Sequence, residues 1–250
     1  MTDHEQSDQM WRMAFVFDAA GGDLDRFRDE FARLDVGRLA LPADVRLRTG
    51  VVDHDPAFGN APETDHDTAI GRTLDAAIEL TFPGAQLHAL VACAPQLAGI
   101  IGALAAPGSV EVMAGPMFAM VPQREGDTIL SLAFVRYPGT TSKEFRDWWK
   151  LQHAPLAIRV LGPGLLAYDQ VHVDREVTEA LCETCGCSAY GYDAYDNLTW
   201  ASPADFVASL ADAEGMAELF RDETGRIHNG SRRHAMLRRI APDTDRGDLK

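Results

Sequence analysis

The stretch Met13-Ala-Phe-Val-Phe17 recurs 119 residues further along the chain as Leu132-Ala-Phe-Val-Arg136. Several short matches in one order at one offset predict that the chain contains two copies of one folding unit. We place these copies at residues 11–122 and 127–241. Three further pairs match at offsets of 118 or 119 residues: Arg26-Phe-Arg-Asp-Glu-Phe31 with Glu144-Phe-Arg-Asp-Trp-Trp149, Asp75-Ala-Ala-Ile-Glu-Leu-Thr-Phe82 with Asp193-Ala-Tyr-Asp-Asn-Leu-Thr-Trp200, and Leu87-His-Ala-Leu-Val-Ala-Cys-Ala94 with Phe206-Val-Ala-Ser-Leu-Ala-Asp-Ala213.

The second copy shows its element order most clearly. Thr141 and Glu144 form a capping-box pattern that predicts the start of a helix, and Gly162-Pro163-Gly164 predicts its end. Apolar, β-rich stretches predict the strands, and helical spacing predicts one more helix. The resulting βαββαβ order is that of a ferredoxin-like unit, with strands at 129–137, 165–173, 190–200 and 235–240 and the second helix at 203–221.

A four-stranded sheet with both helices on one face leaves the other face uncovered. Two such units in one chain can cover each other's bare faces. The sequence therefore predicts an α+β fold in which two tandem ferredoxin-like repeats form an intramolecular dimeric α+β barrel.

The composition narrows the class of protein and its partners. The chain has 250 residues, of which 46% are hydrophobic, and 23 Lys and Arg against 38 Asp and Glu give a net charge of −15. Such an acidic surface argues against binding to nucleic acid phosphates. Four cysteines are too few and too clustered for a disulfide framework, and the first ten residues lack the apolar core of a signal peptide. We expect a cytoplasmic protein with reduced thiols.

One segment is unusually apolar, since residues 80–110 contain no Asp, Glu, Lys or Arg. Pro95 and Gln96 in its middle, followed by Gly99 and Gly102, argue against a membrane-spanning helix. We expect instead that a helix from Ala89 to Ala106 packs against another subunit, so that the protein is a homo-oligomer without a membrane partner.

A motif in the second copy carries a family resemblance. It consists of Phe145-x-x-Trp148-Trp149-x-x-x-His153-Ala-Pro-Leu-Ala157, then Tyr168-x-Gln170-x-His172, then Asp193, and more weakly Arg221-Asp222-Glu223. This pattern resembles the EthD family of dimeric α+β-barrel proteins. Related barrels include muconolactone isomerases, polyketide cyclases and decarboxylases, quinone-forming monooxygenases and haem-binding enzymes, so the resemblance implies the architecture more narrowly than the reaction.

His153 is the candidate catalytic residue. It follows Trp149 by four positions and Phe145 by eight, which places it on the core-facing side of the helix, and Pro155 interrupts the helical hydrogen bonds there. An imidazole titrates near neutral pH and can take and return a proton without a cofactor. The alternative is a structural histidine bonded to a backbone carbonyl or to the Tyr168 hydroxyl. The first copy has no His-Ala-Pro, so a single site is expected in the second copy.

Tyr168, Gln170 and His172 alternate along a strand and share one face of the sheet. We expect this face to be the barrel interior, where the three side chains would orient a phenol, quinone or carbonyl; on the outer face they would only bond neighbouring groups. Trp149 and Asp193 complete the expected substrate-binding set. Because Asp75 occupies the matching position in the first copy, a structural role for Asp193 is the alternative.

Cys182-x-x-Cys185-x-Cys187 lies in a stretch with little periodicity, residues 174–189, and the first copy has an equally long insertion at residues 53–72. Three thiols at this spacing could hold zinc or copper, but free thiols are the more common outcome. We expect the paired insertions to be lids over the two barrel mouths. We expect no cofactor, with haem or a metal ion as the open alternatives.

The sequence thus predicts a small-molecule enzyme with an apolar, aromatic or polyketide-like substrate in the barrel. His153 would act as general acid and base in a lyase, isomerase, cyclase or dehydratase step. An oxidoreductase, cofactor-free or haem-dependent and acting on aromatic or ether compounds, is the second reading, and a non-catalytic protein that binds a hydrophobic ligand is the third.

Overall fold

The computed structural model describes residues 8–21, 23–34, 41–60, 72–122, 124–188 and 190–240. Residues 61–71, most of the first predicted insertion, lie outside this part of the chain. The first half contains β1 (Met10–Phe17), α2 (Leu24–Ala32), β2 (Arg46–Val52), β3 (Arg72–Thr73), β4 (Ala76–Pro83), α3 (Leu87–Gly102) and β5 (Glu111–Val121). The second contains β6 (Thr128–Phe134), α4 (Ser142–Trp148), α5 (Ala154–Leu161), β7 (Ala167–His172), α6 (Arg175–Cys185), β8 (Ala194–Trp200), α7 (Pro203–Ser209), α8 (Ala213–Glu223) and β9 (Arg233–Arg239).

Eight antiparallel strands form a closed barrel. Their order is β2-β4-β1-β5-β7-β8-β6-β9, and β9 pairs back with β2, while the two-residue β3 adds to β9 in parallel. Within the barrel, the first half has the order β5-β1-β4-β2 and the second half has the order β9-β6-β8-β7. Both orders are those of a ferredoxin-like βαββαβ unit, so the predicted fold class, a dimeric α+β barrel within one chain, is confirmed.

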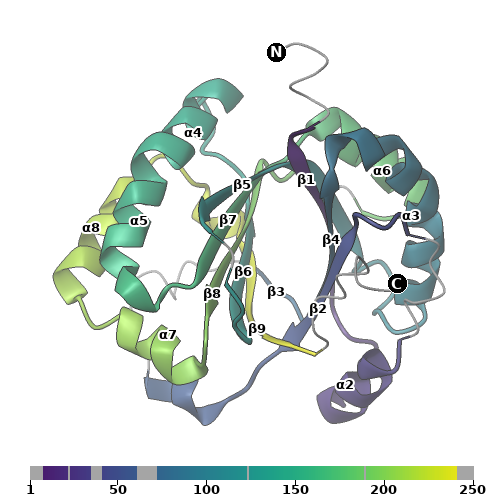
Figure 1. Cartoon of the computed structure of the whole chain (residues 1–250), viewed down its shortest axis with the longest axis horizontal. Coiled ribbons are helices and arrows are strands. Elements are labelled where there is room, and N and C mark those ends of the chain that lie inside the picture. Colours follow the sequence, from purple (N-terminus) through teal and green to yellow (C-terminus); the bar gives the residue numbers. More distant parts are fainter. Residues whose placement is uncertain are drawn as a thin grey trace.

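Helices cover the outside of the barrel in two groups (Figure 1). α4, α5, α7 and α8 lie against the second-half strands, and α2, α3 and α6 lie on the opposite side. Two expectations about these elements were wrong. The helix predicted at 203–221 is two helices, α7 and α8, and the aperiodic stretch 174–189 contains the helix α6, capped by the Asp174 side chain and ended by Gly186 in a left-handed conformation.

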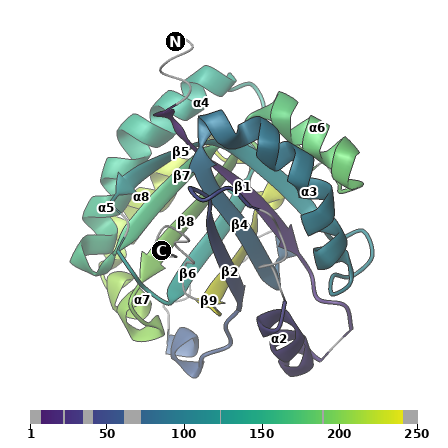
Figure 2. The same ribbon diagram turned by 45° about the vertical axis from the view of Figure 1, so that its right-hand side comes forward.

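α6 belongs to the second half in sequence but packs on the first half. It contacts α3 and β5, and Figure 2 shows it beside α3. Its Leu181 and Cys182 join the apolar core that β1 and β4 form with α2 and α3. The second insertion therefore packs on the outside of the first half and binds the two halves together, and it is not the expected lid over a barrel mouth.

The apolar α3 keeps an uncharged outer face. Leu90, Ala94, Leu97 and Ile101 are buried, while Ala89, Ala92 and Gly99 are among its exposed residues. By length and composition, Gly84–Gly102 would be long and apolar enough to cross a membrane, and 28% of that window is buried. The expectation that this helix contacts another subunit stays a prediction.

Side chains from both halves are buried in the barrel interior, and some of them are charged. Arg12 of β1 pairs with Asp169 of β7 at 2.8 Å, and both are 1% exposed. Glu79 of β4 pairs with Arg48 and accepts hydrogen bonds from Tyr195 and Asn197 of β8. A cavity lined by Glu79, Asn197 and their neighbours measures about 10 Å³. Two charged pairs and an apolar cluster therefore occupy the space in which the sequence placed the substrate.

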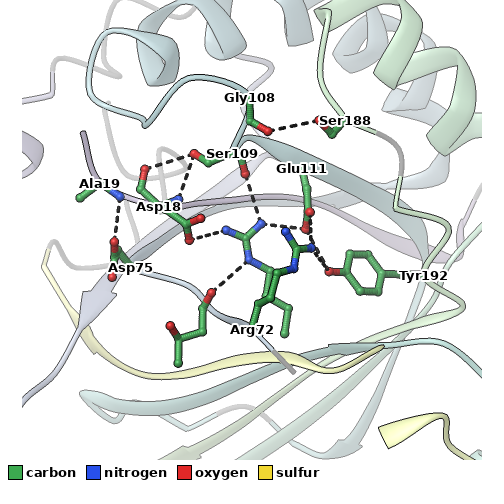
Figure 3. A network of polar contacts seen from close by, with 11 residues as sticks. Asp18, Ala19, Arg72, Asp75, Gly108, Ser109, Glu111, Ser188 and Tyr192 are labelled. Atoms are coloured by element: carbon green, nitrogen blue, oxygen red, sulfur yellow. Dashed lines mark hydrogen bonds and ion pairs between the residues drawn. The ribbon is translucent and has the colours of Figure 1, made fainter. Parts of the chain in front are cut away.

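One end of the barrel is closed by a second polar network (Figure 3). Glu111, at the start of β5, pairs with Arg72 at 2.5 Å and accepts a 3.0 Å hydrogen bond from the Tyr192 hydroxyl. Arg233 of β9, which is fully buried, pairs with both Glu111 and Asp18. Two arginines and two carboxylates balance in charge, so this network ties strand ends together.

Candidate functional site between the helices and sheet of the second half

His153 lies at an irregular turn between two helices. The predicted capping box at Thr141 and Glu144 is present and starts α4. Between α4 and α5, Trp149–His153 form a π-helical turn, immediately before Pro155 near the start of α5. Single π turns inside helices are frequent at functional sites. The turn directs His153 inward, and the residue is 6% exposed, as the helical spacing predicted.

Asp222 of α8 orients the His153 ring. Its Oδ2 lies 3.0 Å from Nδ1 of His153, and its Oδ1 accepts a 3.2 Å hydrogen bond from Nε1 of Trp148. The hydrogen bond from His153 lowers the pKa of Asp222, so the carboxylate is ionised at neutral pH. An ionised Asp222 accepts a hydrogen bond from the Nδ1–H group, and in that tautomer the ring lone pair lies on Nε2. This contact replaces the bond to Tyr168 that the structural alternative for His153 supposed.

A second carboxylate faces the other side of the ring. Oε1 of Glu223 lies 3.8 Å from Nε2 of His153, and its Oε2 pairs with Arg232 at 2.5 Å. Glu223 and Arg232 are each 8% exposed. The positive charge of Arg232 balances the negative charge of Glu223. Asp222 then supplies the remaining negative charge beside His153.

Tyr168, Gln170 and His172 share one face of β7, but this face is the outer one, which packs against the helices. Tyr168 clusters with Ala154 and Ala157 of α5, and Nε2 of Gln170 donates to the carbonyl of Trp149 (3.0 Å) as well as to the Tyr168 hydroxyl (2.9 Å). Asp169 and Val171, at the alternate positions, face the barrel interior. The expectation that the row lines the barrel was therefore wrong, and the structure brings it instead to the layer that holds His153.

His172 and Trp149 form an aromatic wall of this layer. Their rings stack with centroids 5.1 Å apart, and the ring centroids of Phe118 of β5 and His172 are 4.6 Å apart. Burial, with the nearby charges of Arg146 and Lys150, lowers the pKa of His172 to about 3. His172 is therefore neutral at physiological pH and cannot serve as a general acid there.

Asp196 is a buried carboxyl group that the sequence did not single out. It lies on β8 directly across from Gln170 of β7, on the face that meets the helices, and is 3% exposed. Burial raises its pKa well above the ordinary value; Glu223 adds to this and Arg232 opposes it. Burial likewise raises the pKa of Tyr168. In the layer beneath His153, burial thus favours the uncharged forms of one carboxyl group and one phenol.

Asp193 has the contacts of a structural residue. Its carboxylate accepts from the backbone N–H of Arg136 (3.0 Å) and pairs with the guanidinium groups of Arg136 and Arg175. Asp75 of the first half accepts in the same way from the backbone N–H of Ala19 at 2.8 Å (Figure 3). Both aspartates anchor the chain that follows the first strand of their half.

The three clustered cysteines are free thiols. Burial raises the pKa of Cys182 to about 11, so its thiolate is scarce at neutral pH. Across the described ranges, no three His, Cys, Asp or Glu side chains are arranged to hold a metal ion. His172, a potential fourth ligand from the preceding strand, lies instead between Trp149 and Phe118.

His172 does not fit an axial haem ligand, because its ring lies between Trp149 and Phe118 and its Nε2 points toward Oε1 of Gln170. We assign no step to haem.

Four site residues escaped sequence reasoning in whole or in part. Asp222 and Glu223 appeared only as a weak extension of the family pattern, and Asp196 and Arg232 did not appear at all. One signal was present for Asp196, because the repeat aligns it with Ile78, a core residue. A carboxylate that replaces an apolar residue at one position of a repeat indicates a local function.

Comparison with known proteins agrees with the fold. Residues 137–227 match the EthD domain model, and a search of the curated proteins gives no match. Among solved structures, a candidate monooxygenase from Fusobacterium nucleatum subsp. nucleatum superimposes with a TM-score of 0.55 at 8% identity over 93% of each chain. An anthrone oxidase-like protein gives 0.56 at 12% identity over 94% of this chain and 93% of its own. A candidate monooxygenase from Lactobacillus acidophilus gives 0.52 at 12% identity over 93% and 95%. These similarities show a shared fold across nearly the whole chain.

Proposed function

We propose that this protein is a small-molecule enzyme whose site lies between the second-half sheet and helices α4, α5 and α8. His153 acts there as general acid and base in a cofactor-independent lyase, isomerase, cyclase or dehydratase step. The observation that carries the proposal is the 3.0 Å contact between His153 Nδ1 and Asp222, made at a π turn, which leaves Nε2 as the proton acceptor within a buried layer.

The chemistry of this pair follows from its charges. When Nε2 takes a proton, the imidazolium that forms is stabilised by Asp222, whose position Trp148 fixes. The surrounding aromatic and aliphatic side chains favour an apolar or aromatic substrate. General acid–base catalysis by a positioned side chain contributes about 10²–10⁴-fold in rate.

The test is solvent exchange at an acidic carbon. The protein is incubated in D₂O with a panel of apolar ketones, 2-tetralone first, and deuterium uptake beside the carbonyl is followed by NMR. We expect His153→Gln to slow exchange by at least about 100-fold and Asp222→Asn by a smaller factor. The control His88→Gln replaces an exposed histidine of α3 and should leave the rate unchanged. Equal rates for wild type and His153→Gln in a folded protein would contradict the assigned role.

Oxidation is the second candidate function. It is favoured by the descriptions of the structural neighbours, two of them candidate monooxygenases and one anthrone oxidase-like. The same dyad could remove the proton from an electron-rich phenol, which dioxygen then oxidises. Oxygen uptake with an anthrone, lost in His153→Gln, would identify this reaction. Ligand binding without either activity would identify a carrier.

A further inference from the structure

Asp196 is the one buried acidic side chain in the His153 layer whose role the ion pairs do not explain. Its Oδ1 is fully buried and has no hydrogen-bond partner among the described residues. Asp222 is held by His153 and Trp148, and Glu223 is held by Arg232. A buried polar atom without a partner costs free energy, so a retained one calls for a ligand or a function.

The neighbours of Asp196 place it within the site. On β7 its cross-strand partner is Gln170, whose amide bonds the carbonyl of Trp149, the first residue of the π turn that ends at His153. Directly opposed residues on one face of a sheet have Cβ atoms about 5 Å apart. From the other side, Glu223 contacts His153 and also acts electrostatically on Asp196 and Tyr168. Glu223 therefore acts on both His153 and Asp196, and Gln170 connects Asp196 to the π turn that carries His153.

The first half shows that this strand position needs no carboxyl group. Ile78 of β4 stands opposite Thr49 of β2, as Asp196 of β8 stands opposite Gln170 of β7, in the same strand order. Ile78 is fully buried in the apolar core of its half. The fold accepts an isoleucine at this position, so folding alone does not account for the aspartate.

We propose that Asp196, as an undissociated carboxylic acid, donates a hydrogen bond to the oxygen atom of a phenolic or enolisable carbonyl substrate while His153 Nε2 takes the substrate's proton. This inference rests on the proposed function and names the second catalytic group and the substrate class. With a phenol, the O–H bond breaks, the N–H bond of His153 forms, and the electron pair stays on the phenolate oxygen. With a ketone, the C–H electron pair becomes the enolate double bond and the carbonyl π pair moves to oxygen.

Asp196 keeps its own proton in this step and stabilises the negative oxygen through the hydrogen bond. A carboxylic acid held neutral in an apolar site can act in this way. The charged and titratable groups that surround it are Glu223 and Arg232, with the neutral Tyr168 on β7. Burial, the largest cause, keeps its pKa raised in spite of Arg232.

A phenol whose ionisation is visible tests the proposal directly. 4-Nitrophenol is bound to the protein at a pH below its own pKa, and the absorbance of nitrophenolate reports the ionised fraction of the bound ligand. The wild-type protein should bind it mainly as phenolate. Asp196→Ile should reduce the ratio of bound phenolate to bound phenol by at least about tenfold, and Asp196→Asn, which keeps an N–H donor, should reduce it less. Thermal melting verifies that both variants are folded.

Each outcome has a distinct meaning. His153→Gln should abolish the phenolate signal, because no acceptor remains for the proton. If His153→Gln loses the signal while Asp196→Ile and Asp196→Asn match wild type, the role of Asp196 is refuted and the proposed function stands. If His153→Gln matches wild type, the proposed function fails. Absence of 4-nitrophenol binding to wild type refutes the substrate class.

Infrared spectroscopy adds a readout independent of any ligand. An undissociated carboxylic acid has a carbonyl stretch separate from that of a carboxylate. The difference spectrum between wild type and Asp196→Asn should contain this band at neutral pH. A carboxylate band at its place would overturn the proposal.

Discussion

Replacing Glu79 with glutamine tests the charged interior of the barrel. Glu79 is 3% exposed, and burial by itself would raise its pKa. The charges of Arg48 and Arg12, with hydrogen bonds from Tyr195 and Asn197, more than offset burial and lower the pKa from 4.5 to about 2. At about 1.4 kcal/mol per pH unit, this difference amounts to roughly 3 kcal/mol of stability at neutral pH.

The sign of the pH dependence follows from the lowered pKa. The unfolded chain binds a proton at Glu79 near pH 4.5, whereas the folded protein resists protonation until about pH 2. The contribution is therefore complete above pH 4.5 and is lost as the pH falls from 4.5 to 2. Glu79→Gln resembles the protonated side chain and should lack this contribution at every pH.

The assay is urea unfolding of both proteins between pH 7 and pH 3, followed by tryptophan fluorescence. Wild type should exceed Glu79→Gln by about 3 kcal/mol at pH 7, and the difference should shrink steadily below pH 4.5. Glu218→Gln is the matched control, because Glu218 pairs with Arg159 at the surface, with the two side chains 49% and 57% exposed. Such a pair contributes about 0–1 kcal/mol. A wild-type advantage below about 1 kcal/mol, or one that is constant from pH 6 to pH 3, would refute the reasoning.

Two further predictions concern a strand crossing and a surface. Gly115→Ala should lower the free energy of unfolding by about 1–3 kcal/mol, because a Cβ there would stand 2.1 Å from the carbonyl oxygen of His172. The control Gly99→Ala, on an open helix face, should raise the free energy of unfolding by up to ~1 kcal/mol. Equal melting temperatures for wild type and Gly115→Ala would contradict the first prediction. Ala92→Glu on the exposed face of α3 should reduce an oligomer to the 27.3 kDa monomer in light scattering, and a wild type that is already monomeric would refute the α3 contact.

The position of His153 could be predicted because it depends on local rules. The spacing of Phe145, Trp149 and His153 along one helix, with Pro155 behind them, sets the direction of the side chain regardless of what packs against it. Its partners could not be predicted in this way. Asp222 lies 69 residues away on α8. The sequence predicted one continuous helix there, but the break between α7 and α8 changes which residues of α8 face His153.

The face of β7 illustrates a different limit. Alternation correctly grouped Tyr168, Gln170 and His172 on one side of the strand, but both sides of β7 are buried in this fold. One side meets the helices and the other meets the barrel interior, and each has polar residues. Neighbouring positions of a strand point to opposite faces, so alternation shows which residues share a face. It does not show whether that face meets the helices or the barrel interior.

The sequence by itself predicted the βαββαβ order and hence the eight-stranded barrel, because hydrophobic periodicity, caps and turns act within a few residues. Tertiary structure decided what occupies the barrel and where the polar groups converge. Arg12 meets Asp169, and Glu79 meets Tyr195 and Asn197, only when strands from the two halves close the sheet. The buried Asp196 likewise joins His153 only through Gln170 and Glu223, because burial and contact between distant segments arise from packing and have no local pattern.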